Sequence, residues 1–163
     1  MFRVGHGIDV HQFSADKTRP CVLGGVTIPD APGLLGHSDA DVIIHALCDA
    51  LLGAAGLSDI GHLFPDTDPK YKNIPSINLL QHVMNEIRPL GLRAVNVDVT
   101  LLAEVPRIAP YTQKMKETLA IVLDIEIGAI SIKASTTERL GFIGRREGVE
   151  AHAVCLLRNE SGR

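Results

Sequence analysis

The chain has 163 residues, of which 45% are hydrophobic and 21% charged, the composition of an ordinary globular domain rather than of a disordered or membrane-embedded chain. A formal net charge of −3 offers no basic field for nucleic acid. With 4% aromatic residues and no Trp, the chain also lacks the stacking platforms of single-strand-binding proteins. We therefore expect a single domain over residues 1–163, with no nucleic-acid and no membrane partner.

Cysteine usage and the N-terminus indicate a compartment. Cys21, Cys48 and Cys155 are widely separated and form no CxxC pair, which is typical of a reducing environment rather than of a disulfide framework. The stretch MFRVGHGIDV carries Arg3 and Asp9, so it lacks the uninterrupted apolar run of a secretory signal. We expect a cytoplasmic protein.

The first half of the chain predicts two strands and a helix. Residues 2–11 have the pattern of a strand, and residues 21–29 that of a second strand, which Gly24–Gly25 break, as a bulge or as a hairpin partner. The segment GHSDADV then opens a helix, with Ser38 as its N-cap and Asp41 at the capping-box position.

The second half follows a long polar loop, and loops of such length are more often functional than idle. The order of elements predicts an α+β (mixed α/β) fold, in which helices are layered on one face of a four-stranded mixed sheet. The expected elements are the loop over 58–75, helices over 76–88 and 108–123, and strands over 95–103, 129–135 and 149–158.

Two potential metal ligands lie near the end of the first strand. Because residues two apart on a strand point to the same face, Asp9 and His11 offer a carboxylate oxygen and an imidazole nitrogen side by side. Such a pair suits a borderline cation such as zinc. A solvated Asp–His pair at a strand end is the alternative interpretation, because D-x-H is a weak motif.

The predicted helix supplies a candidate third ligand. Asp41, His45 and Asp49 fall on one side of it and an apolar stripe on the other, so His45 is free to reach a neighbouring element. Asp41 can orient the His45 ring as a hydrogen-bond acceptor, or it can serve only as the capping carboxylate. The alternative interpretation of this side is an ordinary solvated polar face.

Two further segments are candidates for phosphate binding. His37 and Ser38 precede the helix, whose N-terminus favours an anion, although His37 can equally be a plain loop residue. The stretch ASTTE follows the strand over 129–135, and its hydroxyls can donate to phosphate oxygens while Glu138 holds a hard cation such as magnesium. Polar residues after a strand are also common turn formers, which is the alternative for this stretch.

Five motifs together resemble the 2-C-methyl-D-erythritol 2,4-cyclodiphosphate synthase family, nearly end to end and in its order and spacing. They are GHGIDVHQF, GLLGHSDADV, FPDTDP, NVDVTLLAEVPRIAPY and KASTTERLGFIGRREG. The resemblance implies a homotrimer around a threefold axis, with active sites at subunit boundaries. It also implies a phosphorus–oxygen lyase of non-mevalonate isoprenoid biosynthesis. In that reaction the 2-phosphate of 4-diphosphocytidyl-2-C-methyl-D-erythritol 2-phosphate attacks the β-phosphorus, giving 2-C-methyl-D-erythritol 2,4-cyclodiphosphate and CMP.

The same resemblance implies roles for individual residues. About one zinc ion per chain is held by Asp9, His11 and His45, and a second divalent ion, Mg²⁺ or Mn²⁺, by Glu138. His37 and Thr136 stabilise the transition state. The implied substrate contacts are Asp9, His11, His37, Ser38, Thr136, Thr137 and Glu138 near the phosphates, Asp59 and Gly61 at the erythritol hydroxyls, Phe64, Pro65, Asp66, Thr67 and Asp68 as a lid, Ala103, Pro106, Arg107, Ile108, Ala109 and Ser135 around cytosine, and Phe142 and Arg145.

The sequence departs from the family pattern at three positions. Ala40 stands where Gly is usual, and we expect little consequence because helix propensity favours Ala. Arg107 and His62 stand where Lys is common. Arg107 can alter contacts near the nucleotide phosphates, because Arg and Lys are not interchangeable.

Two other functions compete with cyclisation. A hydrolase of nucleoside diphosphate esters would use a metal-bound water as nucleophile, but no general base for water is evident in the sequence. A non-enzymatic nucleotide-binding or assembly module would bind the nucleotide without a bound zinc ion. Product mass distinguishes the first alternative, and metal analysis the second.

Overall fold

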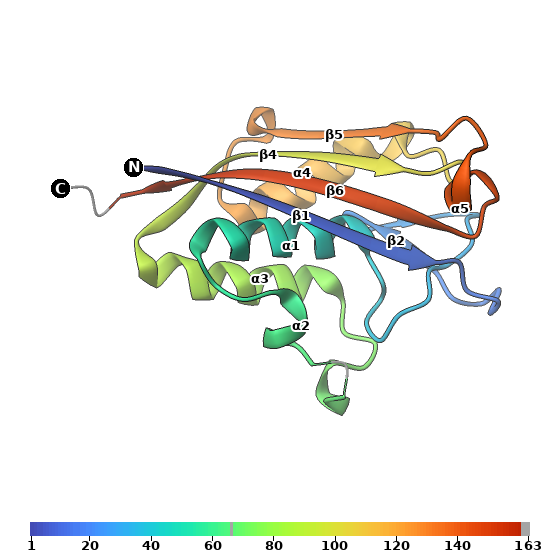
Figure 1. The fold of residues 1–163 in the computed structure, drawn as a ribbon, viewed down its shortest axis with the longest axis horizontal. Helices are drawn as coiled ribbons and strands as arrows, with labels where there is room; N and C mark the ends of the chain where they lie inside the picture. The colour runs from blue at the N-terminus through green and yellow to red at the C-terminus, as the bar shows by residue number, and fades with distance from the viewer. Residues whose placement is uncertain (66, 161–163) are drawn as a thin grey trace.

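The computed structural model describes residues 1–65 and 67–160, and within them one layer is a four-stranded mixed sheet (Figure 1). Its order is β1 (Phe2–Gln12), β6 (Gly148–Asn159), β4 (Leu92–Leu102) and β5 (Ile130–Ser135). β6 runs antiparallel to β1 and β4, and β4 runs parallel to β5. The predicted mixed sheet is confirmed.

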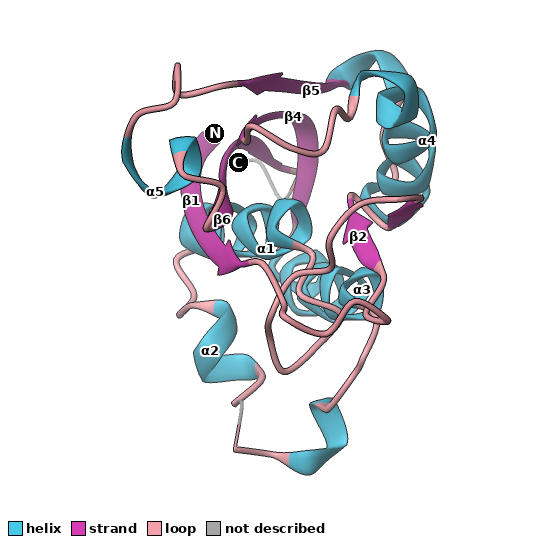
Figure 2. Cartoon of the chain, turned by 90° about the vertical axis from the view of Figure 1, so that its right-hand side faces the viewer, coloured by secondary structure: helices cyan, strands magenta, loops and turns pink. Residues whose placement is uncertain are grey.

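Helices cover one face of this sheet, as the element order predicts. Figure 2 shows the strands curving around α1, with α3 and α4 on the same side. The helices are α1 (Val42–Ala55), α3 (Ser76–Ile87) and α4 (Thr112–Leu123), with the short α2 (Ile60–Leu63) and α5 (Gly141–Gly144) at the periphery. In the part of the chain that the structure describes, no helix has both the length and the apolar character that a membrane span requires.

Some predicted boundaries differ from the structure. The expected strand over 21–29 is a hairpin of β2 (Cys21–Leu23) and β3 (Val26–Ile28), and its turn needs the positive φ angles of Gly24 and Gly25, 58° and 75°. The helix predicted from 108 begins at Thr112, after a 3₁₀ turn at Ala109–Tyr111 that contains a proline. The loop over 58–75 contains α2 and a second 3₁₀ turn.

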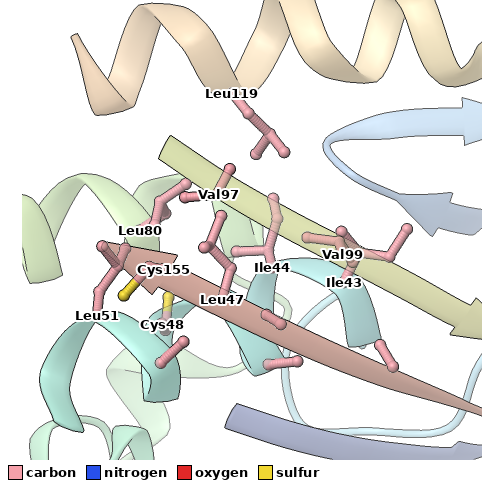
Figure 3. Packing of buried hydrophobic residues seen from close by; sticks show 14 of the residues in the cluster. Ile43, Ile44, Leu47, Cys48, Leu51, Leu80, Val97, Val99, Leu119 and Cys155 are labelled. Atoms are coloured by element: carbon pink, nitrogen blue, oxygen red, sulfur yellow. The ribbon is translucent and has the colours of Figure 1, made fainter. Parts of the chain in front are cut away.

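The α1 helix forms the centre of the core. It packs against β1 and β6 on one side and α3 on the other, which is why nearly all of its residues are buried. Figure 3 shows Ile44 and Leu47 directed toward Val97 of β4, and Leu51 beside Leu80 of α3. Burying such side chains stabilises the fold by about 1.5–3 kcal/mol each.

Two glycines of β1 let α1 approach this strand closely. A Cβ at Gly5 would lie 1.8 Å from the Ala50 carbonyl oxygen, and one at Gly7 would lie 2.1 Å from that of Ala46. Any side chain at either position would therefore push the helix away. By the alternation of a strand, Asp9 and His11 point to the same face as these glycines, toward α1.

Within the residues that the structure describes, the opposite face of β1 and β6 carries no layer of helices. Its residues alternate with the buried ones, and several are apolar and exposed. The most exposed are Val4 at 69%, Phe2 at 61% and Val10 at 48%. His6 and His152 stack on this face, with ring centroids 5.7 Å apart.

Candidate active site

Asp9, His11 and His45 converge at the junction of β1 and α1. Asp9 Oδ2 lies 2.9 Å from His11 Nε2 and 3.0 Å from His45 Nδ1, and the two imidazole nitrogens are 3.0 Å apart. All three side chains are half-buried, and one ligand atom from each lies within 4.8 Å of the others. The convergence predicted from the sequence is confirmed, and His45 is not part of a solvated polar face.

The imidazole of His11 is held from behind. Its Nδ1 lies 2.8 Å from the Leu35 carbonyl oxygen, which can only accept, so this nitrogen donates. In neutral His11 the lone pair is therefore on Nε2, the nitrogen that faces Asp9. Both oxygen and nitrogen of this pair are then acceptors.

The electrostatics of the cluster favour a positive charge at its centre. Burial acts to raise the pKa of Asp9, but hydrogen bonds and charge interactions with His11 and His45 outweigh it and hold that pKa at about 2. Burial acts to lower the pKa of His11, and the Asp9 carboxylate outweighs it and raises that pKa. The ionised carboxylate is thus the stable form, and it attracts a cation or a proton.

These side chains fit a divalent cation. Acceptor atoms about 3 Å apart repel one another unless a positive charge lies between them, and a carboxylate with two imidazoles is a donor set that borderline metals accept. Three protein ligands leave a coordination position open for another group. Among residues 1–65 and 67–160, no other group of three or more His, Cys, Asp or Glu side chains is arranged to hold a metal ion.

A pocket of about 320 Å³ opens beside the cluster. Its wall is mostly apolar, with a few convergent polar groups, as in small-molecule sites. His37 lies in this wall, and its Nε2 donates to the Asp68 carbonyl oxygen at 3.3 Å. The lining includes His11, His37, Ser38, His45, Gly61 and Phe64.

The start of α1 differs from the prediction. The N-cap is Asp41 and not Ser38, and its fully buried carboxylate accepts from Ile44 N at 3.2 Å, Gly24 N at 2.9 Å and Gly25 N at 2.7 Å. Burial raises the pKa of Asp41 to about 6. Of the two roles considered for Asp41, capping is confirmed; the His45 ring is held by other groups. The α1 N-terminus is therefore capped by this carboxylate.

The turn before α1 also corrects the argument about Ala40. This residue lies outside the helix, fully buried, with a φ of 59° in the left-handed region. Helix propensity is therefore irrelevant there, and Ala carries a cost that Gly would not, of about 1 kcal/mol. Ser38 lies in the same turn, and its Oγ accepts from Ala40 N at 3.1 Å.

One side of the pocket is formed by Ile60, Gly61 and Phe64. Asp59 caps α2 by accepting from His62 N at 2.8 Å, and Asp49 of α1 anchors the same helix by accepting from Ile60 N at 2.8 Å. The Phe64 ring meets the Tyr71 ring edge-on at 5.2 Å. Asp66, predicted to be part of a lid, lies outside the described residues.

The ASTTE stretch lies at the same end of the sheet but not in the cluster. β5 and β1 are opposite edge strands, separated by β6 and β4, so Ser135 is about 14 Å from β1 at the usual strand spacing. Thr136 and Glu138 are exposed, and Thr136 Oγ1 donates to Glu138 Oε1 at 3.1 Å. Within one chain, these residues do not meet Asp9, His11 and His45.

The segment over 103–109 lies against this stretch. Ala103 N donates to the Ser135 carbonyl at 3.0 Å, and Glu104 Oε1 accepts from Thr137 N at 3.2 Å and Arg139 N at 3.1 Å. The Ile108 side chain is buried in the core, so only its backbone can meet a ligand. The remaining predicted contacts here, Pro106, Arg107 and Ala109, follow on the same segment.

Phe142 and Arg145 lie at α5, beside the other side of His11. Phe142 shares a hollow of about 360 Å³ with Val10, His11 and Glu147. Arg145 Nε donates to Glu147 Oε1 at 2.7 Å. Phe142 is thus near the cluster in the same chain, whereas the Arg145 guanidinium is paired with a carboxylate.

Sequence reasoning missed residues that build the site. Gly5 and Gly7 set the distance between β1 and α1, and alternate glycines in an apolar strand were the available signal. Asp39 and Ser76 lie behind His45, and the only signal was the position of Ser76 at a predicted helix start. Tyr71 lines the pocket without any sequence signal.

A candidate metal-binding cluster beside a mostly apolar pocket defines the class, an enzyme that acts on a small molecule. The family model of the YgbB family matches residues 2–158, and the chain belongs to this family. It is 55% identical over 157 residues to 2-C-methyl-D-erythritol 2,4-cyclodiphosphate synthase of Chlorobaculum tepidum, covering 96% of this chain and 99% of that protein.

Solved structures agree with this membership. Bifunctional IspDF from Campylobacter jejuni superposes with a TM-score of 0.92 at 43% identity, covering 98% of this chain and 42% of that longer one. The Plasmodium falciparum IspF CDP complex gives a TM-score of 0.84 at 34% identity, covering 97% and 96%. The family expected from the five motifs is confirmed.

Proposed function

We propose that this chain is a 2-C-methyl-D-erythritol 2,4-cyclodiphosphate synthase, a lyase of non-mevalonate isoprenoid biosynthesis. Its substrate is 4-diphosphocytidyl-2-C-methyl-D-erythritol 2-phosphate. The observation that carries this proposal is the convergence of Asp9, His11 and His45 at a pocket, in a chain of this family. The name of the Chlorobaculum tepidum relative and the CDP complex of the Plasmodium falciparum neighbour support the reaction and the nucleotide.

The reaction is an intramolecular phosphoryl transfer. An oxygen of the 2-phosphate forms a bond to the β-phosphorus, and the bond from that phosphorus to the oxygen bridging to the α-phosphate breaks. CMP leaves with the bridging oxygen and its electron pair, so no water is consumed. Such chemistry asks mainly for positioning and for neutralisation of charge on the phosphates.

Asp9, His11 and His45 would hold the cation, which we assign as zinc from its mixed oxygen and nitrogen ligands. When bound, the ion supplies Lewis-acid polarisation of a phosphate oxygen. His37 lies in the pocket wall, where its imidazole can stabilise charge that develops on the transferred group. Ser38 adds a hydroxyl beside it, and Gly61 lies in the same wall. Asp59, the N-cap of α2, would meet the erythritol hydroxyls together with Gly61.

The ASTTE stretch would complete the site from a neighbouring subunit. Thr136 stabilises the transition state, and Glu138 would hold Mg²⁺ or Mn²⁺ near the α- and β-phosphates. Exposure of these side chains and their distance from β1 support a role across an interface. The further contacts of this half are Thr137, Arg145 and the group around cytosine, which is Ser135, Ala103, Pro106, Arg107, Ile108 and Ala109. The half with the metal includes Phe142 and the lid residues Phe64, Pro65, Thr67 and Asp68.

A homotrimer around a threefold axis is the assembly we infer. Support comes from the uncovered face of β1 and β6, where Phe2, Val4 and Val10 are exposed in one chain. Apolar patches of this kind commonly mark interfaces. The free, buried Cys21, Cys48 and Cys155 support a cytoplasmic location, where thiols stay reduced.

Product analysis tests this function. Incubation of the protein with the cytidyl diphosphate substrate and divalent metal should release CMP without inorganic phosphate. The two products together should have the mass of the substrate. A product heavier by the mass of one water would establish hydrolysis instead, and nucleotide binding without turnover or bound metal would establish a non-enzymatic module.

A further inference from the structure

The His45 ring has a second polar side, away from Asp9 and His11. Its Nε2 is 2.9 Å from Ser76 Oγ and 3.1 Å from Ser38 Oγ. Ser76 is the first residue of α3 and is fully buried. The ring is therefore clamped between the acidic side chain on β1 and a hydroxyl on another helix.

Asp39 fixes the direction of this hydroxyl. Its carboxylate accepts from Ser76 N at 3.0 Å through Oδ2 and from the Ser76 hydroxyl through Oδ1. A carboxylate oxygen only accepts, and a serine hydroxyl carries a single proton. Because that proton is given to Asp39, Ser76 Oγ can meet His45 only as an acceptor.

An acceptor on this side sets the tautomer of neutral His45. The Ser76 acceptor favours the proton on Nε2, which leaves the lone pair on Nδ1, the nitrogen 3.0 Å from Asp9 Oδ2. We infer that Asp39 and Ser76 are positioning residues that hold His45 with its Nδ1 lone pair directed at the cation site. The inference rests on the metal site of the proposed function. It gives Asp39 and Ser76, which lie outside the substrate pocket, the role of orienting a metal ligand.

The two histidines are oriented by different kinds of group. His11 is oriented by the Leu35 carbonyl, which no side-chain substitution removes. His45 is oriented by the Asp39 carboxylate acting through Ser76. Partners of this kind orient metal ligands, and their loss commonly lowers metal affinity by about 10–100-fold.

Asp39→Asn reverses the direction of the hydrogen bond to Ser76 Oγ without changing the size of the side chain at position 39. The amide would still accept from Ser76 N through its oxygen, but its NH₂ group would donate to Ser76 Oγ. The Ser76 proton would then be free to point at His45 Nε2, favouring the tautomer with the proton on Nδ1. We expect Zn²⁺ affinity, measured by competition with a chelator, to fall by about 10–100-fold. The visible spectrum of the Co²⁺-loaded protein should change with it.

Asp124→Asn is the matched control, because Asp124 is exposed at the end of α4 and has a left-handed φ of 59°, which Asn tolerates. This control should bind Zn²⁺ and Co²⁺ as the wild type does. Nitrogen-15 NMR of the metal-free proteins, above the imidazole titration range, reads the tautomer directly. The fraction of His45 rings with the proton on Nε2 should be larger in the wild type than in Asp39→Asn.

A double-mutant cycle separates this role from general damage. Ser76→Ala keeps Ser38 Oγ near His45 Nε2, so its loss of affinity should be smaller than that of Asp39→Asn. Because Asp39 acts through Ser76, adding Asp39→Asn to Ser76→Ala should cost nothing further. Equal losses from Asp39→Asn with and without Ser76, or wild-type affinity in Asp39→Asn, would overturn the inference. A wild type that binds neither metal would instead overturn the metal site itself.

Discussion

The two halves of the proposed site differ in how completely one chain builds them. The side chains of Asp9, His11 and His45 are half-buried and lie within hydrogen-bond distance of one another. Hydrogen bonds to Leu35 and Ser76 hold the two imidazoles in place. The ASTTE stretch is exposed at the other edge of the sheet. A single chain thus builds the metal half in advance, whereas in the proposed homotrimer the second half would come from a neighbouring subunit.

The largest effect should come from removing a metal ligand from the metal half of the site. His45→Ala deletes one of the converging acceptor atoms, and we expect it to abolish both metal binding and CMP release. We expect the proposed trimer to remain assembled, because this substitution leaves the exposed face of β1 and β6 untouched. Metal content and native mass measure these outcomes, and wild-type turnover in this variant would contradict the ligand assignment.

A second change tests whether the close approach of β1 and α1 builds the metal half. Gly7→Ala places a Cβ 2.1 Å from the Ala46 carbonyl, so helix and strand must separate and His45 must withdraw from Asp9. We expect a loss of about 1–3 kcal/mol in the free energy of unfolding, together with weaker metal binding.

Gly53→Ala is the matched control for this change. Gly53 lies on α1, the helix that Gly7 contacts, and nothing lies within 4 Å of the added Cβ. This substitution should stabilise the protein by about 0.5–1 kcal/mol. Chemical denaturation measures both variants. Equal stability of Gly7→Ala and wild type would show that the glycine does not set this distance.

A third change concerns the stability of the N-terminus of α1 as a function of pH. The pKa of Asp41 is raised to about 6, so the folded state binds its proton more tightly than the unfolded state does. The stabilisation that this gives is present below about pH 4 and is lost as pH rises through about 6. Asp41→Asn lacks this titration. Relative to the variant, the wild type should lose about 3 kcal/mol of unfolding free energy between about pH 4 and 7. A constant difference across this range would contradict the assignment.

Much of the metal half could be predicted from the periodicity of strand and helix residues along the sequence. The alternation of a strand places Asp9 and His11 on one face, and the helical period turns His45 away from the apolar stripe. The order of elements likewise predicts the mixed sheet with its helical layer, and the structure confirms it. These features depend on neighbouring residues, so the sequence pattern carries them.

The features that failed depend on contacts between distant segments. Ser38 and Asp41 are both good caps by residue type, and the choice falls on Asp41 because the β2–β3 turn supplies two more donors to its carboxylate. Asp39 reaches Ser76, 37 residues away, from a turn in which Ala40 adopts a left-handed φ. No period in the sequence reports such contacts.

Mixing inactive variants tests most directly whether the site is shared between subunits. His45→Ala removes the metal half and the double change Thr136→Ala with Glu138→Ala removes the other, so each protein alone should be inactive. In a random 1:1 mixture, each mixed trimer keeps one intact interface, which leaves about a quarter of all sites functional. Purification through two different affinity tags removes the homogeneous trimers, so we predict that the purified mixed trimers regain about a third of wild-type CMP release. Mixed trimers that stay inactive would contradict the account.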